Sequence, residues 1–272
     1  MNRIDRMFEE LDQKGEAALM CYLPAIGPDF KRSMEVIDAF VDGGVDMIEL
    51  SVPGGAPWLD GAPMQTHHKQ SRDTHIDTEK AFELGKQVRE RYPQLPILPM
   101  AYYAAVARTG LEQFIAFAAE ADVDGIELPD YPSYSAGDPR GFHSGLRAAG
   151  IYNINFCDGI SLAPEGSPNY ALLKDIATDV DGFLFLTATP GVTGGQGEVA
   201  VAHLSQAVQR IRAVQQEAGR LKPILVGFGL TRPEHVRQVI QQVGADAVVV
   251  GSAVSRLINQ GEPATTIRDF IA

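Results

Sequence analysis

The sequence is short of several features that would place it in a specialised class of protein. It has only two cysteines in 272 residues, Cys21 and Cys157. Both lie in apolar strand-like segments, which favours buried thiols over a disulfide framework. No apolar run approaches the length of about 18 residues that a membrane-spanning helix needs. The first residues also lack the apolar core of a signal peptide. We therefore expect a soluble, cytoplasmic protein.

Positive charge is also scarce. The chain has 23 Lys and Arg against 35 Asp and Glu, a net charge of −12. Nucleic acids and anionic membranes both require a basic face, so neither is an expected partner. The chain is 45% hydrophobic and has no linker, low-complexity segment or charge block. One large core is therefore expected, in a single domain that spans residues 1–272.

The usual motifs of cofactor and covalent chemistry are missing. There is no Walker motif and no GxGxxG after the first predicted strand. None of the seven lysines lies at the C-terminal end of a predicted strand, where a Schiff-base aldolase would need one. His67, His68 and His75 are close in sequence, but their segment is polar and is expected to form a solvated face. We expect neither a metal nor a cofactor.

The chain does contain a regular alternation of short apolar runs and amphipathic stretches. The runs are nearly continuous, as is typical of parallel strands covered on both faces. There are eight: 17–23, 45–51, 96–102, 123–128, 151–157, 182–188, 223–229 and 246–252. This pattern predicts an α/β fold, a single (β/α)8 TIM barrel, with an extra N-terminal helix near residues 2–14 closing its bottom. A doubly wound open sheet is the alternative architecture.

Two carboxylates fall where a barrel of this kind carries its active site, at the C-terminal ends of the strands. In "IELSVPGGAPWLDGAP", Glu49 is near the end of a strand and Asp60 is on the loop that follows. A partly desolvated Glu49 would have a raised pKa and suit acid/base work. The competing interpretation is an ion pair at Glu49 and a turn at Asp60. Glu127 and Asp130 in "IELPD" show that acidic strand ends recur.

Three glycine-rich segments follow the last three predicted strands: 189–195, 227–231 and 251–254. Backbone N–H groups at such loops and helix starts bind phosphate without a lysine. Together the segments predict a phosphate site, although glycines also serve as helix caps and turns. With no lysine and no metal cluster available, we expect acid/base chemistry on a phosphorylated substrate that carries its own electron sink.

The motifs resemble those of the tryptophan synthase alpha subunit family over nearly the whole chain. The family pattern E-L-G-x-P-F-S-D-P-x-A-D-G-P corresponds to "ELSVPGGAPWLDGAP", with both acidic positions kept in spacing. The family's G-V-T-G, G-F-G-I and G-S-A segments correspond to "GVTGG", "GFGL" and "GSAV".

This resemblance implies a retro-aldol lyase that cleaves indole-3-glycerol phosphate to indole and glyceraldehyde 3-phosphate. It implies that Glu49 transfers the proton at indole C3 and that Asp60 binds the indole N–H. The resemblance assigns the substrate phosphate to Gly194, Gly229, Gly251 and Ser252. It assigns the pocket or its closing loop to Tyr22, Tyr102, Asp130, Phe185 and Thr193.

Some positions depart from the family pattern. Gly54, Gly55 and Ala56 replace the family's F-S-D, on a loop that faces the β subunit in the family, so the resemblance makes a tryptophan synthase β-like partner doubtful. Phe185 stands where the family has a tyrosine. Asn153 and Asn155 stand where it has mostly apolar pocket residues.

Three functions therefore remain open. One is an indole-3-glycerol phosphate lyase, which could work alone. Another is a retro-aldol lyase for a related, more polar substrate in a specialised pathway. The third is a non-catalytic partner that binds phosphate ligands and regulates a β-like subunit.

Overall fold

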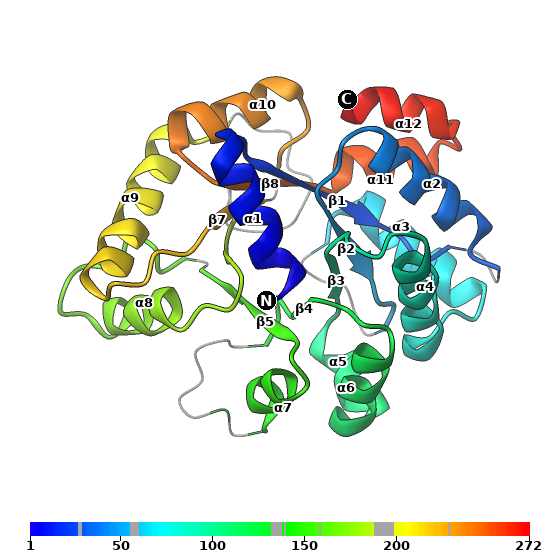
Figure 1. Cartoon of the computed structure of the whole chain (residues 1–272), viewed down its shortest axis with the longest axis horizontal. Coiled ribbons are helices and arrows are strands. Elements are labelled where there is room, and N and C mark those ends of the chain that lie inside the picture. The colour runs from blue at the N-terminus through cyan, green and yellow to red at the C-terminus, as the bar shows by residue number, and fades with distance from the viewer. Residues whose placement is uncertain are drawn as a thin grey trace.

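Eight parallel strands close into a barrel in which β1 pairs with β8 (Figure 1). The computed structural model describes residues 1–26, 29–54, 60–131, 138, 140–157, 159–187, 199–227 and 229–272. The strands are β1 (Ala18–Leu23), β2 (Met47–Ser51), β3 (Ile97–Met100), β4 (Gly125–Glu127), β5 (Tyr152–Phe156), β6 (Leu184–Thr187), β7 (Ile224–Gly227) and β8 (Ala247–Val250). Every predicted strand is present, and the closed ring excludes the open sheet.

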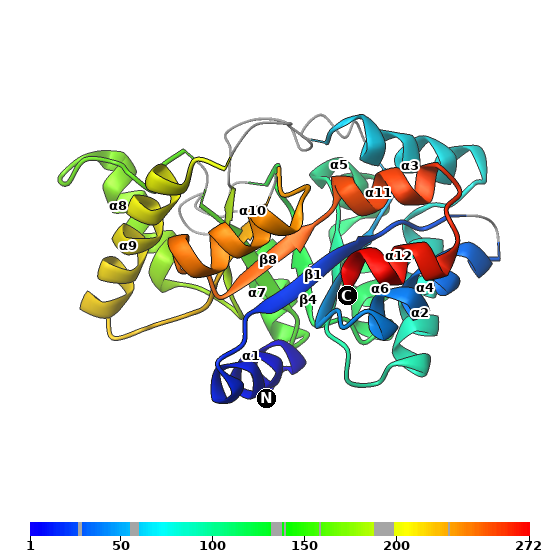
Figure 2. The same cartoon turned by 90° about the horizontal axis from the view of Figure 1, so that it is seen from above.

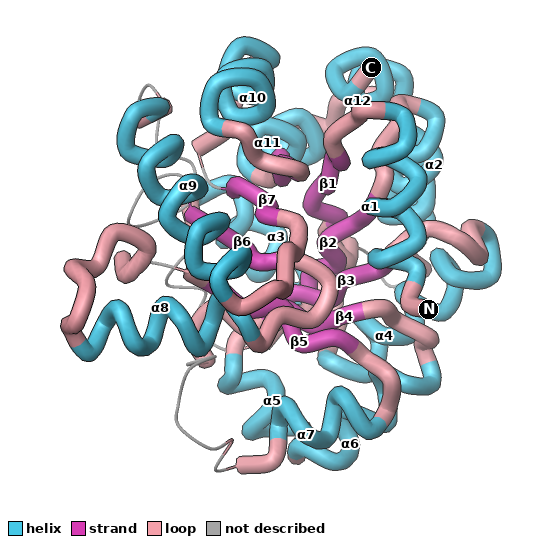
Figure 3. Tube along the Cα trace, turned by 60° about the vertical axis from the view of Figure 1, so that its left-hand side comes forward, coloured by secondary structure: helices cyan, strands magenta, loops and turns pink. Residues whose placement is uncertain are grey.

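Helices surround the ring of strands (Figure 3), which confirms the (β/α)8 barrel. They are α1 (Arg3–Lys14), α2 (Lys31–Asp42), α3 (Ala62–Asp73), α4 (Thr78–Arg91), α5 (Tyr103–Thr109), α6 (Leu111–Glu120), α7 (Phe142–Ala148), α8 (Pro168–Thr178), α9 (Val201–Glu217), α10 (Pro233–Gln238), the π-helical segment Val239–Val243, α11 (Ser252–Asn259) and α12 (Ala264–Ile271). In the described part of the chain, no helix has the length and apolar character needed to cross a bilayer.

The strands are apolar on both faces because both faces are buried. Inward residues such as Met20, Met47 and Leu98 pack together inside the barrel. Outward residues such as Ile48 pack instead under the surrounding helices. Cys21 is a buried thiol in this outer layer, and Cys157 is buried as well, as the sequence predicts.

Helix α1 closes one end of the barrel, while α3 lies at the opposite end (Figure 2). The helix begins after Asn2, whose side chain accepts a hydrogen bond from the Ile4 N–H and caps the first turn. Ile4 is fully buried among the inward residues of the strands, and the ring of Phe8 packs edge-on against Phe183 at 6.0 Å. The predicted N-terminal helix is therefore confirmed, and it leaves only the opposite end open.

A buried ion pair holds the closed end together. Nη2 of Arg89 on α4 lies 2.6 Å from Oδ2 of Asp124, just before β4. Asp124 also accepts the Ile97 N–H at 2.8 Å, and Arg3 on α1 lies 3.0 Å away. Every charge in this group therefore has a partner, and the group joins α1, α4, β3 and β4.

We expect Asp124→Asn to lower the free energy of unfolding by about 3 kcal/mol, because it leaves Arg89 buried without its counter-charge. Urea denaturation would measure the change. The matched control is Asp73→Asn, which breaks the exposed Lys69–Asp73 pair and should cost less than about 0.5 kcal/mol. Equal effects of the two substitutions would contradict the role given to the buried pair.

Candidate active site

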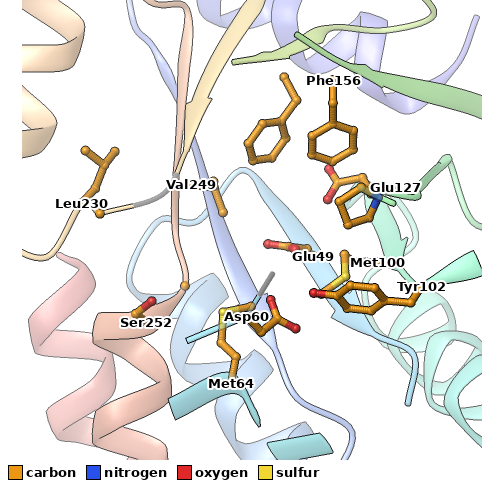
Figure 4. Close-up of a pocket in the computed structure, with 14 residues that line it drawn as sticks. Glu49, Asp60, Met64, Met100, Tyr102, Glu127, Phe156, Leu230, Val249 and Ser252 are labelled. Atoms are coloured by element: carbon orange, nitrogen blue, oxygen red, sulfur yellow. The ribbon is translucent and has the colours of Figure 1, made fainter. Parts of the chain in front are cut away.

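A cavity opens at the C-terminal ends of the strands, with about 540 Å³ of empty space when its open mouth is included (Figure 4). Both predicted catalytic residues, Glu49 and Asp60, lie on its wall. The described residues that line it are Glu49, Asp60, Met64, Met100, Tyr102, Glu127, Pro129, Phe156, Phe185, Gly229, Leu230, Val249, Gly251 and Ser252.

Strand register places Glu49 at the level of the cavity. Glu49 pairs with Tyr22 on β1 and with Leu98 on β3, and its side chain is only 7% exposed. Among the described residues no ion pair reaches it, so the alternative of a structural ion pair at Glu49 is not supported. Burial, reinforced by the charge of Asp60, raises the pKa of Glu49 to about 8. Glu49 therefore holds a proton at neutral pH.

Asp60 lies two residues before α3, next to its N-cap Gly61, and is 3% exposed. Its Oδ2 lies 3.1 Å from Nε2 of His68, close enough for a hydrogen bond from the ring to the carboxylate. His68 is itself buried on α3, so its ring holds the Asp60 carboxylate in a fixed orientation. Sequence reasoning missed this contact, although the spacing of eight residues puts His68 on the helix that Asp60 introduces.

The prediction of a solvated histidine face is wrong for two of its three members. His67 and His68 are buried, and only His75 is exposed. The polar character of α3 led to the error, because α11 packs over this helix and covers the side that bears His67. Burial lowers the pKa of His67 to about 4, so its ring is neutral. In the described ranges, no three metal-binding side chains come together.

Glu127 is a third carboxylate on the cavity wall. It ends β4 beside Met100 of β3, and it is 0% exposed. Within the part of the chain that the structure describes, neither of its carboxylate oxygens has a hydrogen-bond partner. Burial and the charge of Glu49 raise the pKa of Glu127 well above its usual range. In the sequence, Glu127 ends a strand as Glu49 does. Because acidic strand ends recur, this position alone does not predict that Glu127 lies in the cavity.

Aromatic rings form one wall of the cavity. Phe185, a predicted pocket residue, stacks on Phe156 with ring centroids 4.7 Å apart. Phe185 also lies against Gly227, where any Cβ would come within 2.5 Å of its ring. Tyr102 lines the cavity as predicted, and Tyr22 is buried against the lining residues instead of on the surface of the cavity.

Three of the four predicted phosphate-binding residues reach the same cavity. Gly229 follows β7 with a φ of 81°, a conformation that favours glycine. Gly251 and Ser252 lie at the start of α11, where the first backbone N–H groups have no partner inside the helix. Gly194 and Thr193 lie outside the described residues.

Other polar residues singled out from the sequence have structural partners elsewhere. Asp130 is absent from the cavity lining, and its Oδ1 accepts the Tyr103 N–H at 2.7 Å at the start of α5. Asn153 donates to Asn155 at 2.8 Å, and Asn155 donates to the Asp179 carbonyl at 2.7 Å. Inward positions on β5 belong to Ile154 and Phe156, so the two amides face the helix layer, and they give no support for a polar substrate.

Comparison with known proteins finds sequence matches over nearly the whole chain. A sequence profile described as "Tryptophan synthase alpha chain" matches residues 8–270. A tryptophan synthase alpha chain from Methanothermobacter thermautotrophicus is 37% identical over 243 residues, which cover 89% of this chain and 83% of that one. Another, from Methanosarcina barkeri, is 33% identical over 264 residues, covering 96% and 90%.

Solved structures agree with the sequence matches. A structure from Aquifex aeolicus VF5 superposes with a TM-score of 0.84 at 27% identity, covering 100% of this chain and 96% of that one. A tryptophan synthase complex from Pyrococcus furiosus superposes with a TM-score of 0.75 at 28% identity, covering 93% and 95%.

The raised pKa of Glu49 predicts a pH-dependent cost in stability. The folded protein keeps the Glu49 proton up to a pH of about 8, whereas the unfolded chain releases it near the ordinary value of 4.5. The contribution of Glu49 to stability is thus fully present below pH 4.5 and is lost as the pH rises through 8. Relative to the wild type, Glu49→Gln should gain stability across this window, by at most roughly 5 kcal/mol.

Urea denaturation at pH 5 and at pH 9 would measure this gain. The higher pH lies about one unit above the pKa of Glu49 in the folded protein. The control is Glu9→Gln, because Glu9 is exposed on α1 and the substitution should follow the wild type at both pH values. A Glu49→Gln curve parallel to that of the wild type would show that Glu49 is not held protonated by the fold.

Proposed function

Because the chain belongs to the tryptophan synthase alpha chain family, we propose that it cleaves indole-3-glycerol phosphate to indole and glyceraldehyde 3-phosphate. It is a carbon–carbon lyase by this membership. The observation that carries the proposal is the meeting of Glu49, Asp60 and the Gly229, Gly251 and Ser252 backbone in one cavity. A binding module would need the phosphate contacts but has no use for two buried carboxyl groups.

Glu49 transfers the protons. Since it is protonated at neutral pH, it begins as an acid and places a proton on C3 of the indole ring. The ring then carries an iminium-like positive charge, which accepts the electron pair of the breaking C–C bond. The side-chain hydroxyl next to that bond becomes the aldehyde and returns its proton to Glu49. One proton leaves Glu49 and one comes back, so the enzyme is unchanged after a turnover.

Asp60 stabilises the charge that develops on the ring. An ionised carboxylate accepts the indole N–H more strongly once the ring becomes cationic, so the interaction favours the transition state. His68 holds Oδ2 of Asp60 at 3.1 Å and acts as a positioning residue for this contact. Asp60 also immediately follows residues 55–59, outside the described part of the chain, and by the family resemblance Thr193 closes over it.

The substrate phosphate is held by backbone groups. Gly229, Gly251 and Ser252 present N–H groups after β7 and β8, the strands whose loops usually bind phosphate in this fold. Gly194 would complete the site by family resemblance. No lysine is among the described residues that line the cavity, which supports cleavage without a Schiff base, and the indole ring supplies the electron sink that a metal would otherwise provide.

A tryptophan synthase β-like subunit is the natural partner to test, since the Pyrococcus furiosus relative is part of a tryptophan synthase complex. The sequence at Gly54–Gly55–Ala56 argues for independent action. Gly54 is buried against α5 with a φ of 151°, and a Cβ there would lie 3.0 Å from that of Ala105, so a larger residue would be strained at this position. We propose that the chain turns over without a β subunit.

The first prediction is that the purified chain releases indole from indole-3-glycerol phosphate and that Glu49→Gln abolishes this release. The amide keeps the shape of Glu49 but can neither give nor take the proton, so kcat should fall by at least about 10³-fold. Indole release would be followed with and without an added tryptophan synthase β subunit.

Binding of glyceraldehyde 3-phosphate, measured by calorimetry, should be unchanged in Glu49→Gln and serves as the folding control. Turnover at the wild-type rate in this variant would rule out the proposed acid/base role. Release that requires the β subunit would rule out independent action while leaving the chemistry in place.

The second prediction concerns the phosphate. Ser252→Asp places a negative charge at the start of α11, where the substrate dianion is proposed to bind, and should raise KM by about tenfold or more with a smaller effect on kcat. Gln206→Asp, on the exposed surface of α9, is the matched control and should leave both constants unchanged. An unchanged KM in Ser252→Asp would move the phosphate site elsewhere.

A further inference from the structure

Glu127 has no role in the reaction as described, yet it is aimed into the substrate cavity. Its side chain is fully buried, and both of its oxygens lack a partner among the described residues. A buried carboxyl group without hydrogen bonds costs free energy, and a leucine-sized apolar residue would fill the position at no such cost. Such a group is retained at a binding site when a ligand supplies the missing partner.

Barrel order shows which part of the substrate lies near Glu127. The proposed phosphate contacts follow β7 and β8, and in a closed ring of eight strands β4 lies opposite β8. Figure 4 shows the same arrangement, with Ser252 and Leu230 on one side of the cavity and Glu127, Met100 and Tyr102 on the other. A substrate bound by its phosphate at β8 therefore presents its aromatic end to Glu127.

The protonation state of Glu127 limits which group of a ligand can be its hydrogen-bond partner. Glu127 and Glu49 are buried on the lining of the same cavity, on strands separated only by β3, and the charge of one disfavours ionisation of the other. Burial keeps Glu127 neutral, as a carboxylic acid that donates through its O–H and accepts through its C=O. The smallest group that both donates and accepts in return is a hydroxyl. Apart from the Tyr102 hydroxyl, the rest of this wall is apolar and comprises Met100, Pro129, Phe156 and Phe185.

We propose that Glu127 selects a substrate whose indole ring carries a hydroxyl group, so that a hydroxyindole glycerol phosphate is preferred over the unsubstituted compound. This rests on the proposed lyase function and specifies its substrate class. The neighbouring rings of Phe156 and Phe185 contact the face of the indole ring. Glu127 hydrogen-bonds a hydroxyl on the edge of that ring that is farthest from the phosphate.

The reverse reaction gives a direct test. Glyceraldehyde 3-phosphate is condensed with indole or with 4-, 5-, 6- or 7-hydroxyindole, and kcat/KM is measured for the wild type, Glu127→Leu and Glu127→Gln. In the wild type one hydroxyindole should exceed indole by about tenfold or more, because a site built to bind a hydroxyl discriminates against its absence. Glu127→Leu should reverse this preference, and Glu127→Gln should keep part of it.

Thermal unfolding of the ligand-free proteins separates recognition from packing. Glu127→Leu removes an unsatisfied buried group and should raise Tm by about 3 °C. A selectivity ratio that is the same in all three proteins would overturn the proposal. So would a Glu127→Leu variant that loses turnover of indole and of the hydroxyindoles equally, since Glu127 would then belong to the chemistry.

The lyase function itself is tested separately by indole release from indole-3-glycerol phosphate. A wild type that turns over indole and all four hydroxyindoles at one rate would overturn the role of Glu127 and leave the lyase intact. A wild type that turns over none of them and releases no indole would refute the lyase function on which the role of Glu127 depends.

Discussion

Closure of the barrel is the constraint on which the site depends. Because β8 pairs back onto β1, every strand must keep its register, and each residue is committed to the interior or to the helix layer. Register puts Tyr22 beside Glu49 and Met100 beside Glu127. A carboxylate at such a level has no route to bulk water except through the cavity. Its charged form is therefore disfavoured, and the raised pKa of Glu49 follows from its place in the ring.

The two ends of β4 show how differently the fold treats buried acids. Asp124, just before the strand, is ionised and is paired with Arg89 and Arg3 at the closed end. Glu127, three residues later, has no partner in the described structure. The paired Asp124 is compatible with a stable fold, whereas the unpaired Glu127 lowers stability at the open end of the barrel. The same holds for Glu49, which keeps its proton because no cation among the described residues neutralises it. The paired buried charges thus lie at the α1 end of the barrel, and the unpaired acids line the cavity at the opposite end.

The structure changes the interpretation of the residues that depart from the family pattern. The amides Asn153 and Asn155 belong to the helix layer and satisfy each other and the Asp179 carbonyl, so their polarity is structural. Phe185 stands where the family resemblance gives a tyrosine, and its ring stacks on Phe156 and lies against Gly227. Glu127, unlike the two amides, does reach the substrate cavity.

The sequence by itself determined the barrel, the N-terminal helix and the positions of Glu49 and Asp60. These follow from local patterns, namely eight apolar runs at regular spacing and a motif that spans a single strand and loop. Only the tertiary structure decided which polar residues face the cavity. Periodicity does not distinguish the inward from the outward face of a strand that is buried on both, so Asn153 and Glu127 looked alike in sequence. Nor does the polarity of α3 reveal that α11 covers His67, or that His68 lies beneath Asp60, because burial of a helix face depends on elements distant in the chain.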